Sequence, residues 1–327
     1  MTEVGVLLFS ALLTVILRKL YTYKNVVDVP NSRSSHNAPT PRGGGLAIVI
    51  AFYIGSSLLY LNGLIPKDLY WALWTAVPVA IVSFIDDLFD ISAKIRLSVQ
   101  IISAVMALAI LHHYWRIDLY FWRLEGGITL PFLLLILIWM TNLYNFLDGI
   151  DGYAGMEAIY VSLSAFIFFH NEIFLMMAAS VGGFLIFNWE RATIFMGDVG
   201  SAYLGFLFGV FIVYFSRSEG ATLIWVMLLS LFWVDATLTL YRRFMMGEPI
   251  TLAHKKHAYQ RAVQAGFRHS HVVCGGMLLN MVSLLILIAF RDSPWLPISV
   301  FFWITVLYMV VRWIDKHKPM RDWKEVI

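Results

Sequence analysis

Long apolar runs recur from one end of the chain to the other, and they restrict the possible folds more than any other feature. Several approach about 20 residues, the length of helix that crosses the hydrocarbon core of a bilayer. Hydrophobic residues make up 60% of the sequence, against about 45–50% apolar residues in soluble domains. Because a backbone inside lipid must satisfy its own hydrogen bonds, these runs predict helices. The sequence therefore predicts an all-α, polytopic membrane protein.

We expect about 10–11 transmembrane helices, forming a single integral-membrane domain over residues 1–327. The first run lacks a positively charged leader and a small-residue cleavage site, so we expect it to remain as a span. The single cysteine, Cys274, excludes an intramolecular disulfide. The predicted spans cover residues 4–20, 46–61, 70–85, 95–111, 129–147, 154–169, 173–187, 202–215, 222–240, 271–290 and 296–311.

The distribution of positive charge predicts the orientation in the membrane. Short loops rich in Lys and Arg stay in the cytoplasm, and an N-out, C-in orientation places most of these residues there. Every acidic or glycine-rich motif then lies on the cytoplasmic side, where we expect the active site. On the outer side, the aromatic-rich segment 112–127 predicts an interfacial hairpin. Of the 24 Lys and Arg residues, the only ones on the outer side are Lys67, Arg116, Arg123, Arg217 and Arg291.

One polar stretch directly follows an apolar run and holds two amides and two carboxylates three residues apart: Asn142, Asn145, Asp148 and Asp151. The glycines that follow predict that the helix ends near residue 147. Carboxylate and amide oxygens are ligands that suit a hard cation such as Mg²⁺, which usually binds together with phosphate. By itself, the stretch fits an interhelical turn with solvated caps equally well.

A second acidic motif, Asp86-Asp87-Leu-Phe-Asp90, closes the third predicted span. On a continuing helix these carboxylates share one face, and a divalent cation would relieve their repulsion. Lys94 and Arg96 follow closely enough to contact a phosphate held by the metal. Solvated charges at a helix end explain the motif less well, because acids beside a membrane span are usually functional.

The first cytoplasmic loop carries Pro-Thr-Pro-Arg42-Gly43-Gly44-Gly45. Glycines allow close backbone approach, and successive N–H groups can form a nest for an anionic oxygen. Arg42 adds a bidentate phosphate donor. The loop lacks the lysine of a P-loop. Taken alone, a Pro/Gly turn with a positive-inside arginine explains it better than a phosphate site.

The fourth cytoplasmic loop ends in Gly197-Asp198-Val-Gly-Ser201. Ser201 can cap the next helix, whose N-terminus favours a nearby anion. This motif is weak by itself and gains weight as a second oxygen-rich loop on the same face.

The fifth cytoplasmic loop contains His254-Lys-Lys-His257-Ala-Tyr-Gln-Arg261. The two histidines would be neighbours on a helix, and the basic residues around them suit phosphate better than a transition metal. A basic helix against anionic lipid headgroups is the alternative. Nearby, Asp235 lies inside a predicted span and needs a partner, for which we expect Arg242 or Arg243. The Asp235 carboxylate could shape the active site or lock two helices together, and the sequence fits both roles equally well.

Five motifs, in this order, resemble those of the polyprenyl-phosphate N-acetylhexosamine-1-phosphate transferases, glycosyltransferase family 4. They are P-T-P-R-G-G-G, D-D-L-F-D, N-x-x-N-F-x-D-G-I-D-G, M-G-D-V-G-S and H-K-K-H-A-Y-Q-R, spread between Asp28 and Arg261. The family includes the enzymes that begin O-antigen and teichoic-acid synthesis and the phospho-N-acetylmuramoyl-pentapeptide translocase.

The resemblance implies transfer of a sugar-1-phosphate from a UDP-linked N-acetylated amino sugar to undecaprenyl phosphate, with UMP as the product. It implies Mg²⁺, for which Mn²⁺ can substitute, and a multi-pass location in the bacterial cytoplasmic membrane among its lipids. Dimers occur in the family, and no nucleic-acid partner is expected. By similarity, Asn145 and Asp198 look like metal ligands, while Asp86, Asp87, Asp148 and Asp151 resemble catalytic acids. We expect substrate contacts from Arg42, Gly43, Gly44, Lys94, Asn142, His254 and His257.

Two other functions remain as alternatives. The pentapeptide translocase carries three adjacent histidines where this chain has only His254 and His257, so its activity is the second choice. A polytopic transporter is a distant third, because transport sites lie near the bilayer midplane whereas these acids gather at span ends on one face.

Overall fold

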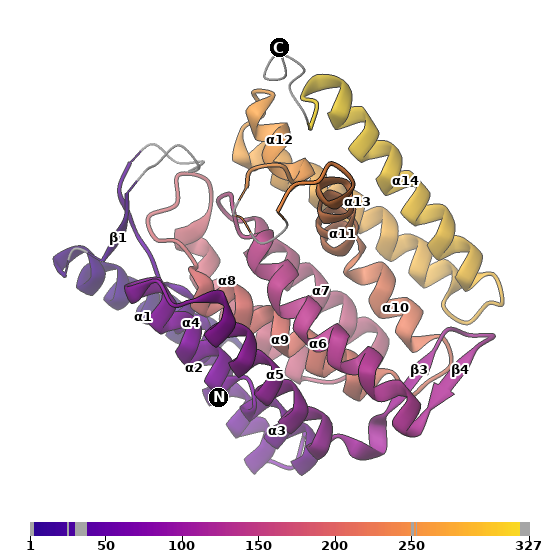
Figure 1. Cartoon of the computed structure of the whole chain (residues 1–327). Helices are drawn as coiled ribbons and strands as arrows, with labels where there is room; N and C mark the ends of the chain where they lie inside the picture. Colours follow the sequence, from indigo (N-terminus) through magenta and orange to yellow (C-terminus); the bar gives the residue numbers. More distant parts are fainter. Residues whose placement is uncertain (1–2, 25, 30–37, 250–251, 253, 321–327) are drawn as a thin grey trace.

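Most of the chain forms α-helices that pack side by side (Figure 1). The computed structural model describes residues 3–24, 26–29, 38–249, 252 and 254–320. The first half contains α1 (Glu3–Tyr23), α2 (Gly45–Leu61), α3 (Lys67–Trp74), α4 (Val77–Phe89), α5 (Ala93–Ile110), α6 (Leu130–Phe146) and α7 (Tyr153–Phe169). The second half contains α8 (Ile173–Asn188), α9 (Asp198–Phe215), α10 (Ala221–Leu228), α11 (Ser230–Met245), α12 (Ala258–Gln264), α13 (His269–Phe290) and α14 (Leu296–His317).

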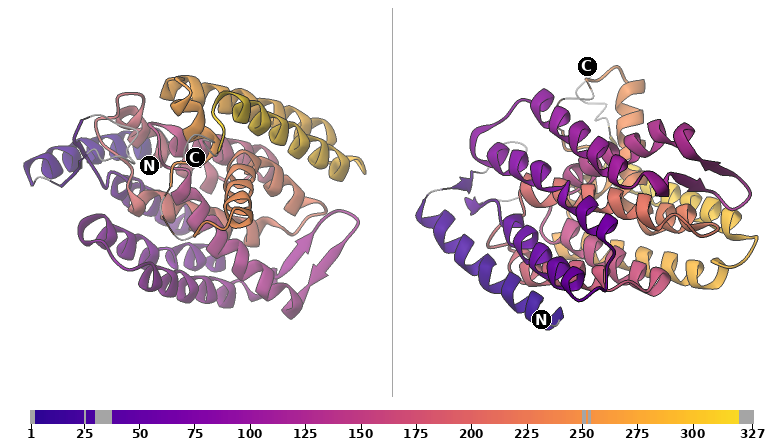
Figure 2. Two further views of the ribbon diagram at one scale, coloured as in Figure 1. Left: turned by 45° about the horizontal axis from the view of Figure 1, so that its top comes forward. Right: turned by 90° about the horizontal axis from the view of Figure 1, so that it is seen from below.

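Two short antiparallel strand pairs complete the described part of the chain. The first joins β1 (Val27–Asp28) to β2 (Thr40–Pro41), and the second joins β3 (Arg116–Asp118) to β4 (Arg123–Glu125). Figure 1 shows the β3–β4 hairpin at the opposite end of the bundle from α12. In both views of Figure 2, α1 and α2 lie on the opposite side of the molecule from α13 and α14.

The prediction of an all-α polytopic membrane protein is confirmed, with a smaller number of full-length spans. Among the described residues, seven helical segments are long and apolar enough to cross a membrane, and the pair α10–α11, bent by 72°, would make eight. Three further predicted runs form α2, α7 and α8, which have only 16 or 17 residues. At 1.5 Å per residue such helices reach about 25 Å, less than the roughly 30 Å of a hydrocarbon core.

Helix α9 forms the centre of the bundle and packs against α2, α4 and α6. Its side chains are buried on all sides, including Phe206, Phe208 and Phe211. A helix surrounded by protein has no polar face, which explains why its sequence is apolar around the whole circumference. This central helix begins at Asp198.

The β3–β4 hairpin forms within segment 112–127, as predicted, and is fastened by one buried carboxylate. Its location on the outer side stays a prediction. Asp118 is fully buried and accepts hydrogen bonds from the N–H groups of Tyr120 and Gly220. It also pairs with Arg116 at 2.7 Å and Arg123 at 2.9 Å. Burial by itself would raise the pKa of Asp118, but the Gly220 N–H and the arginines lower it to about 2. Its stabilising effect is present above about pH 4 and is lost as the pH falls towards 2.

We expect Asp118→Asn to lower the stability of the outer end of the bundle by about 2–3 kcal/mol, because it leaves two arginines facing a neutral group. Glu125→Gln is the matched control, since Glu125 faces the same two arginines from an exposed position and should change stability by less than about 1 kcal/mol. Thermal unfolding of the purified protein in detergent measures both. Equal shifts for the two variants would contradict the role of Asp118.

Candidate active site

The carboxylate of Asp87 binds the N-terminus of α9. Its Oδ1 accepts the N–H of Asp198 at 2.9 Å, and its Oδ2 accepts the N–H of Val199 at 3.1 Å. The first N–H groups of a helix have no partner within the helix, and the helix dipole favours a negative charge there. Gly197 precedes the helix with φ +75°, and a Cβ at this position would lie 2.5 Å from Asp87 Oδ2. The end of α4 and the start of α9 are therefore held in direct contact.

Two arginines connect three acids into one cluster. The Nε of Arg42 lies 2.8 Å from Asp87 Oδ1, and its Nη2 lies 2.5 Å from Asp198 Oδ1. The Nη1 of Arg96 contacts Asp86 Oδ2 and lies 3.0 Å from Asp198 Oδ2. Asp86 Oδ1 also accepts the N–H of Ile91, the second residue after the end of α4, at 2.6 Å. We name Arg42, Asp86, Asp87, Arg96 and Asp198 the acid–arginine cluster.

The glycine loop serves close packing in this structure. The N–H of Gly44 donates to the Phe195 carbonyl at 2.9 Å, and that of Gly45 donates to the Met196 carbonyl at 2.8 Å. A Cβ on Gly45 would lie 2.3 Å from the Cα of Gly200, so the two backbones touch. Close approach was predicted correctly. The N–H of Gly44 has a protein acceptor in this structure, which favours the turn over the nest, and a substrate contact of Gly44 stays a prediction.

Gly43 precedes this pair with φ +98°, and a Cβ there would lie 3.3 Å from the ring of Tyr21. Its neighbour Arg42 is the member of the glycine loop that reaches the acids. A substrate contact of Gly43 stays a prediction.

The four polar residues predicted as one oxygen-rich stretch lie at the end of α6 and in the loop that follows it, and they contact different neighbours. Asn145 faces the start of α9 and donates from Nδ2 to Ser201 Oγ at 3.2 Å. Asp148 lies in the following loop, where burial and then the nearby charge of Asp198 raise its pKa well above the ordinary range. Asn142 instead donates to Gln100 Oε1 on α5 at 2.8 Å. The expected end of the helix near residue 147 is confirmed, since α6 ends at Phe146.

Asp151 binds the loop before α9, which was predicted to be the fourth cytoplasmic loop. Its Oδ2 accepts the N–H groups of Arg191 and Ala192, and lies 3.2 Å from Nδ1 of His269 at the start of α13. These contacts give Asp151 a role in positioning two segments. Among the described residues, no contact joins Asp151 to the acid–arginine cluster. Its expected catalytic role stays a prediction.

Asp235 of α11 holds the segment with His257, which was predicted to belong to the fifth cytoplasmic loop. Asp235 accepts the N–H groups of Ala258 at 2.8 Å and Tyr259 at 3.2 Å, and its Oδ1 lies 3.5 Å from Nδ1 of buried His257. The expected arginine partners were wrong. Arg242 pairs with Asp315 of α14, and Arg243 pairs with Glu248. Asp235 thus locks α11 to the start of α12.

The two histidines, His254 and His257, lie side by side and close to the end of α6. The rings of His254 and His257 are 4.8 Å apart, and that of His257 stacks on Phe146 at 6.2 Å. The hydroxyl of Tyr259 donates to the Phe146 carbonyl at 3.0 Å. Burial, followed by the neighbouring His257 and Arg243, lowers the pKa of His254 to about 3. His254 is therefore neutral at neutral pH and offers hydrogen bonds rather than a charge.

Arg96 is the residue whose importance the sequence understated. Lys94, which we expected to bind substrate, is exposed at the start of α5. Arg96 reaches both Asp86 and Asp198. The signal was present in the spacing, since Arg96 and Gln100 share a helix face and Gln100 binds Asn142. Tyr259 and His269 carried no comparable signal.

The donor set fits Mg²⁺ bound together with a substrate. Among the described residues, no three His, Cys, Asp or Glu side chains are grouped to hold a metal ion by themselves. Mg²⁺ usually binds through one or two carboxylates, water and substrate phosphates rather than in an all-protein cage. Asp198 and Asn145 supply hard oxygen ligands on neighbouring helices, so the residues present fit such an ion.

The sequence is similar to one known family and to several bacterial transferases. A model of glycosyl transferase family 4 matches residues 69–216. This region of the chain is similar to that family. A probable undecaprenyl-phosphate N-acetylglucosaminyl 1-phosphate transferase of Bacillus subtilis is 26% identical over 96% of this chain and 92% of its own. The undecaprenyl-phosphate alpha-N-acetylglucosaminyl 1-phosphate transferase of Salmonella typhi is 29% identical over 81% of this chain and 76% of its own.

The match to family 4 covers part of the acid–arginine cluster. The matched family 4 region contains Asp86, Asp87, Arg96 and Asp198, while Arg42 and the two loop histidines lie outside it. The structure joins these parts, because the chain before the family 4 region folds back onto the start of α9.

We expect Asp87→Asn to destabilise the fold by at least about 2 kcal/mol, since the amide can accept only one of the two N–H groups and carries no charge for Arg42. Asp90→Asn is the control from the same motif. Asp90 is exposed and has φ 50°, a conformation that Asn tolerates. Thermal unfolding in detergent compares them, and an unchanged midpoint for Asp87→Asn would contradict this anchoring.

Proposed function

We propose that this chain transfers N-acetylglucosamine 1-phosphate from its UDP-linked donor to undecaprenyl phosphate and releases UMP. The acid–arginine cluster carries the proposal, because two guanidinium groups beside three carboxylates suit a reaction between two anionic phosphates. The names of the relatives favour the sugar and the lipid. The product would be the lipid-linked sugar that begins a cell-envelope polysaccharide such as O-antigen.

In the proposed reaction, an oxygen of the lipid phosphate attacks the phosphorus that bears the sugar. A new P–O bond forms, the P–O bond to UMP breaks, and UMP leaves with the electron pair. A Mg²⁺ ion bound at Asn145 and Asp198 would neutralise charge on the diphosphate. The lipid phosphate is largely ionised near neutral pH, since its second pKa is about 6. The site then has to remove at most one proton.

Arginines of the acid–arginine cluster would hold the phosphates. Arg42 and Arg96 are each about one-third exposed, so a substrate oxygen can reach them. Their planar guanidinium groups can donate two hydrogen bonds to phosphate oxygens and would stabilise charge in the transition state. Asp87 is nearly inaccessible and has two N–H partners, which favours positioning over proton transfer. Asp86 and Asp148 remain the candidates for a base.

The fifth cytoplasmic loop would bind the donor. The ring of His257 lies beside Phe146, and His254 lies beside His257. Phe146 is one residue after Asn145 and two before Asp148. Neutral His254 can donate one hydrogen bond to a sugar or phosphate oxygen. We place this loop and the acid–arginine cluster in the cytoplasm, with the N-terminus outside, on the distribution of Lys and Arg.

One assay tests the proposed function. Washed membranes with this protein receive undecaprenyl phosphate and a panel of UDP-sugars, including the UDP-linked N-acetylmuramoyl-pentapeptide, and UMP is measured. We expect release with UDP-N-acetylglucosamine that EDTA abolishes and Mg²⁺ or Mn²⁺ restores.

Release with the pentapeptide donor alone would support the translocase instead, and no release with any donor would overturn the proposal. Sealed inside-out vesicles should be active and right-side-out vesicles inactive, if the orientation is as proposed.

Arg96→Gln should lower UMP release about 100-fold, the typical effect of removing one donor that stabilises transition-state charge. Lys94→Gln is the matched control, because Lys94 lies on the same turn of α5 and is exposed. Its activity should stay near that of the unchanged protein. Membrane insertion is checked by the amount of protein in the membrane fraction. A larger loss of UMP release in Lys94→Gln than in Arg96→Gln would contradict the role of Arg96 in binding the phosphates.

A further inference from the structure

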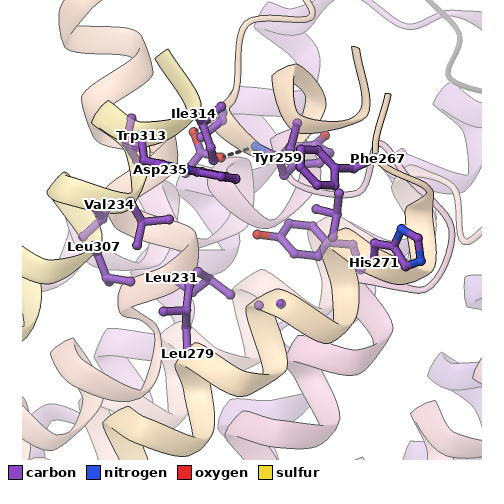
Figure 3. Close-up of a pocket in the computed structure, with 18 residues that line it drawn as sticks. Leu231, Val234, Asp235, Tyr259, Phe267, His271, Leu279, Leu307, Trp313 and Ile314 are labelled. Carbon is purple, nitrogen blue, oxygen red and sulfur yellow. Dashed lines mark hydrogen bonds between the residues drawn. The ribbon is translucent and has the colours of Figure 1, made fainter. Parts of the chain in front are cut away.

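A largely apolar cavity of about 340 Å³ lies between α11, α12, α13 and α14 (Figure 3). Its walls include Leu231 and Val234 of α11, Leu279 of α13, and Leu307 and Trp313 of α14. We name it the α11–α14 pocket. Helices α13 and α14, which form two of its walls, are both long and apolar enough to cross a membrane.

The α11–α14 pocket is separated from the acid–arginine cluster by an aromatic wall. Tyr153 and Tyr259 line the pocket, and their rings stack at 4.9 Å. On its other side, Tyr259 donates to the Phe146 carbonyl, and its hydroxyl would lie 2.1 Å from a Cβ at Gly149. A lipid chain in this pocket would not deliver its own phosphate through that wall to Asp198.

The inside of the pocket offers little to a polar ligand. Asp235 lines it but is only 5% exposed, and it accepts hydrogen bonds from Ala258, Tyr259 and Thr239. The hydroxyl of Tyr259 is likewise engaged. With its polar groups satisfied, the wall favours a hydrocarbon occupant.

The rim of the pocket has the chemistry of a membrane interface with anionic lipid. Phe267 and Trp313 face each other at 6.1 Å and are 38% and 49% exposed. Exposed Arg268 follows Phe267, and exposed His271 lines the pocket one turn later. Aromatic rings gather at headgroup depth, and basic side chains there attract anionic headgroups.

We propose that the α11–α14 pocket binds one acyl chain of an anionic bilayer phospholipid, with the headgroup phosphate beside Arg268. The chain packs against the wall formed by Tyr153 and Tyr259. Because Asp235 and Tyr259 also hold the segment with His257, the bound lipid supports the fifth cytoplasmic loop from its membrane side. This site is independent of the sugar nucleotide and of the acceptor lipid.

Gly275 provides a direct way to fill the pocket. It lines the cavity, and a Cβ at this position would meet nothing within 4 Å. At neighbouring Gly276 a Cβ would lie 3.0 Å from Leu231, so that position is crowded. Gly275→Leu therefore places a side chain in the space of the acyl chain without a clash at Cβ.

The test uses the purified full chain in a mild detergent, titrated with phosphatidylglycerol or phosphatidylcholine. Bound lipid is counted by native mass spectrometry, and the thermal midpoint is followed in parallel. We expect the unchanged protein to prefer phosphatidylglycerol. Gly275→Leu should weaken both lipids by at least about tenfold, since each buried methylene contributes about 0.8 kcal/mol. Arg268→Gln should weaken only phosphatidylglycerol, by about fivefold.

Two control variants distinguish the effect of filling the α11–α14 pocket from that of altering helix α13. Gly275→Ala alters helix propensity but leaves most of the cavity, and Cys274→Leu adds an apolar side chain at an exposed position beside it. Both should bind phosphatidylglycerol like the unchanged protein and show that α13 tolerates substitution here.

Three results would overturn the proposal. In the first, the unchanged protein shows no preference for phosphatidylglycerol. In the second, Gly275→Leu retains the lipid as the unchanged protein does. In the third, Gly275→Leu leaves phosphatidylglycerol binding intact but raises the KM for undecaprenyl phosphate, which would assign the pocket to the acceptor. Lipid binding is measured without substrate, so failure of the proposed enzyme activity would leave this test valid.

Discussion

The contact between the Asp87 carboxylate and the first N–H groups of α9 is the interaction on which the site depends. Inside a membrane protein, an unpaired N–H group or carboxylate is costly, and here each satisfies the other. The contact fixes α4 against the central helix. It also sets the position of Asp198, the first residue of α9 and the acid shared by both arginines.

The acid–arginine cluster follows from this anchor because like charges must be separated. Asp86, Asp87 and Asp198 would repel one another if they met alone. Arg42 comes from the glycine loop and Arg96 from α5, and each bridges two of the acids. The cluster is therefore nearly balanced in charge. Anionic substrates and a cation can enter by exchanging partners with it rather than by creating unpaired charges.

A second set of charges fixes the fifth cytoplasmic loop. Asp235 binds the start of α12, while Arg261 is 2% exposed and pairs with Asp315 of α14 at 2.6 Å. Arg242 of α11 reaches the same carboxylate. The C-terminal helix thus holds the segment with His257 in place, although it lies outside the region matched by the family 4 model. The α11–α14 pocket lies beneath this arrangement.

The sequence by itself determined the helical membrane fold, the approximate limits of its helices and the motifs at their ends. Apolar runs of this length have only one way to satisfy their backbone in lipid. Only the tertiary structure decided which polar residues meet. Asn145 hydrogen-bonds to Ser201 of α9, whereas Asn142, on the same helix, hydrogen-bonds to Gln100 of α5. Asp151 lies beyond the end of α6 and binds the loop before α9. Likewise Arg96 enters the acid–arginine cluster and Lys94 does not, since the direction of a side chain is set by packing between helices distant in the sequence.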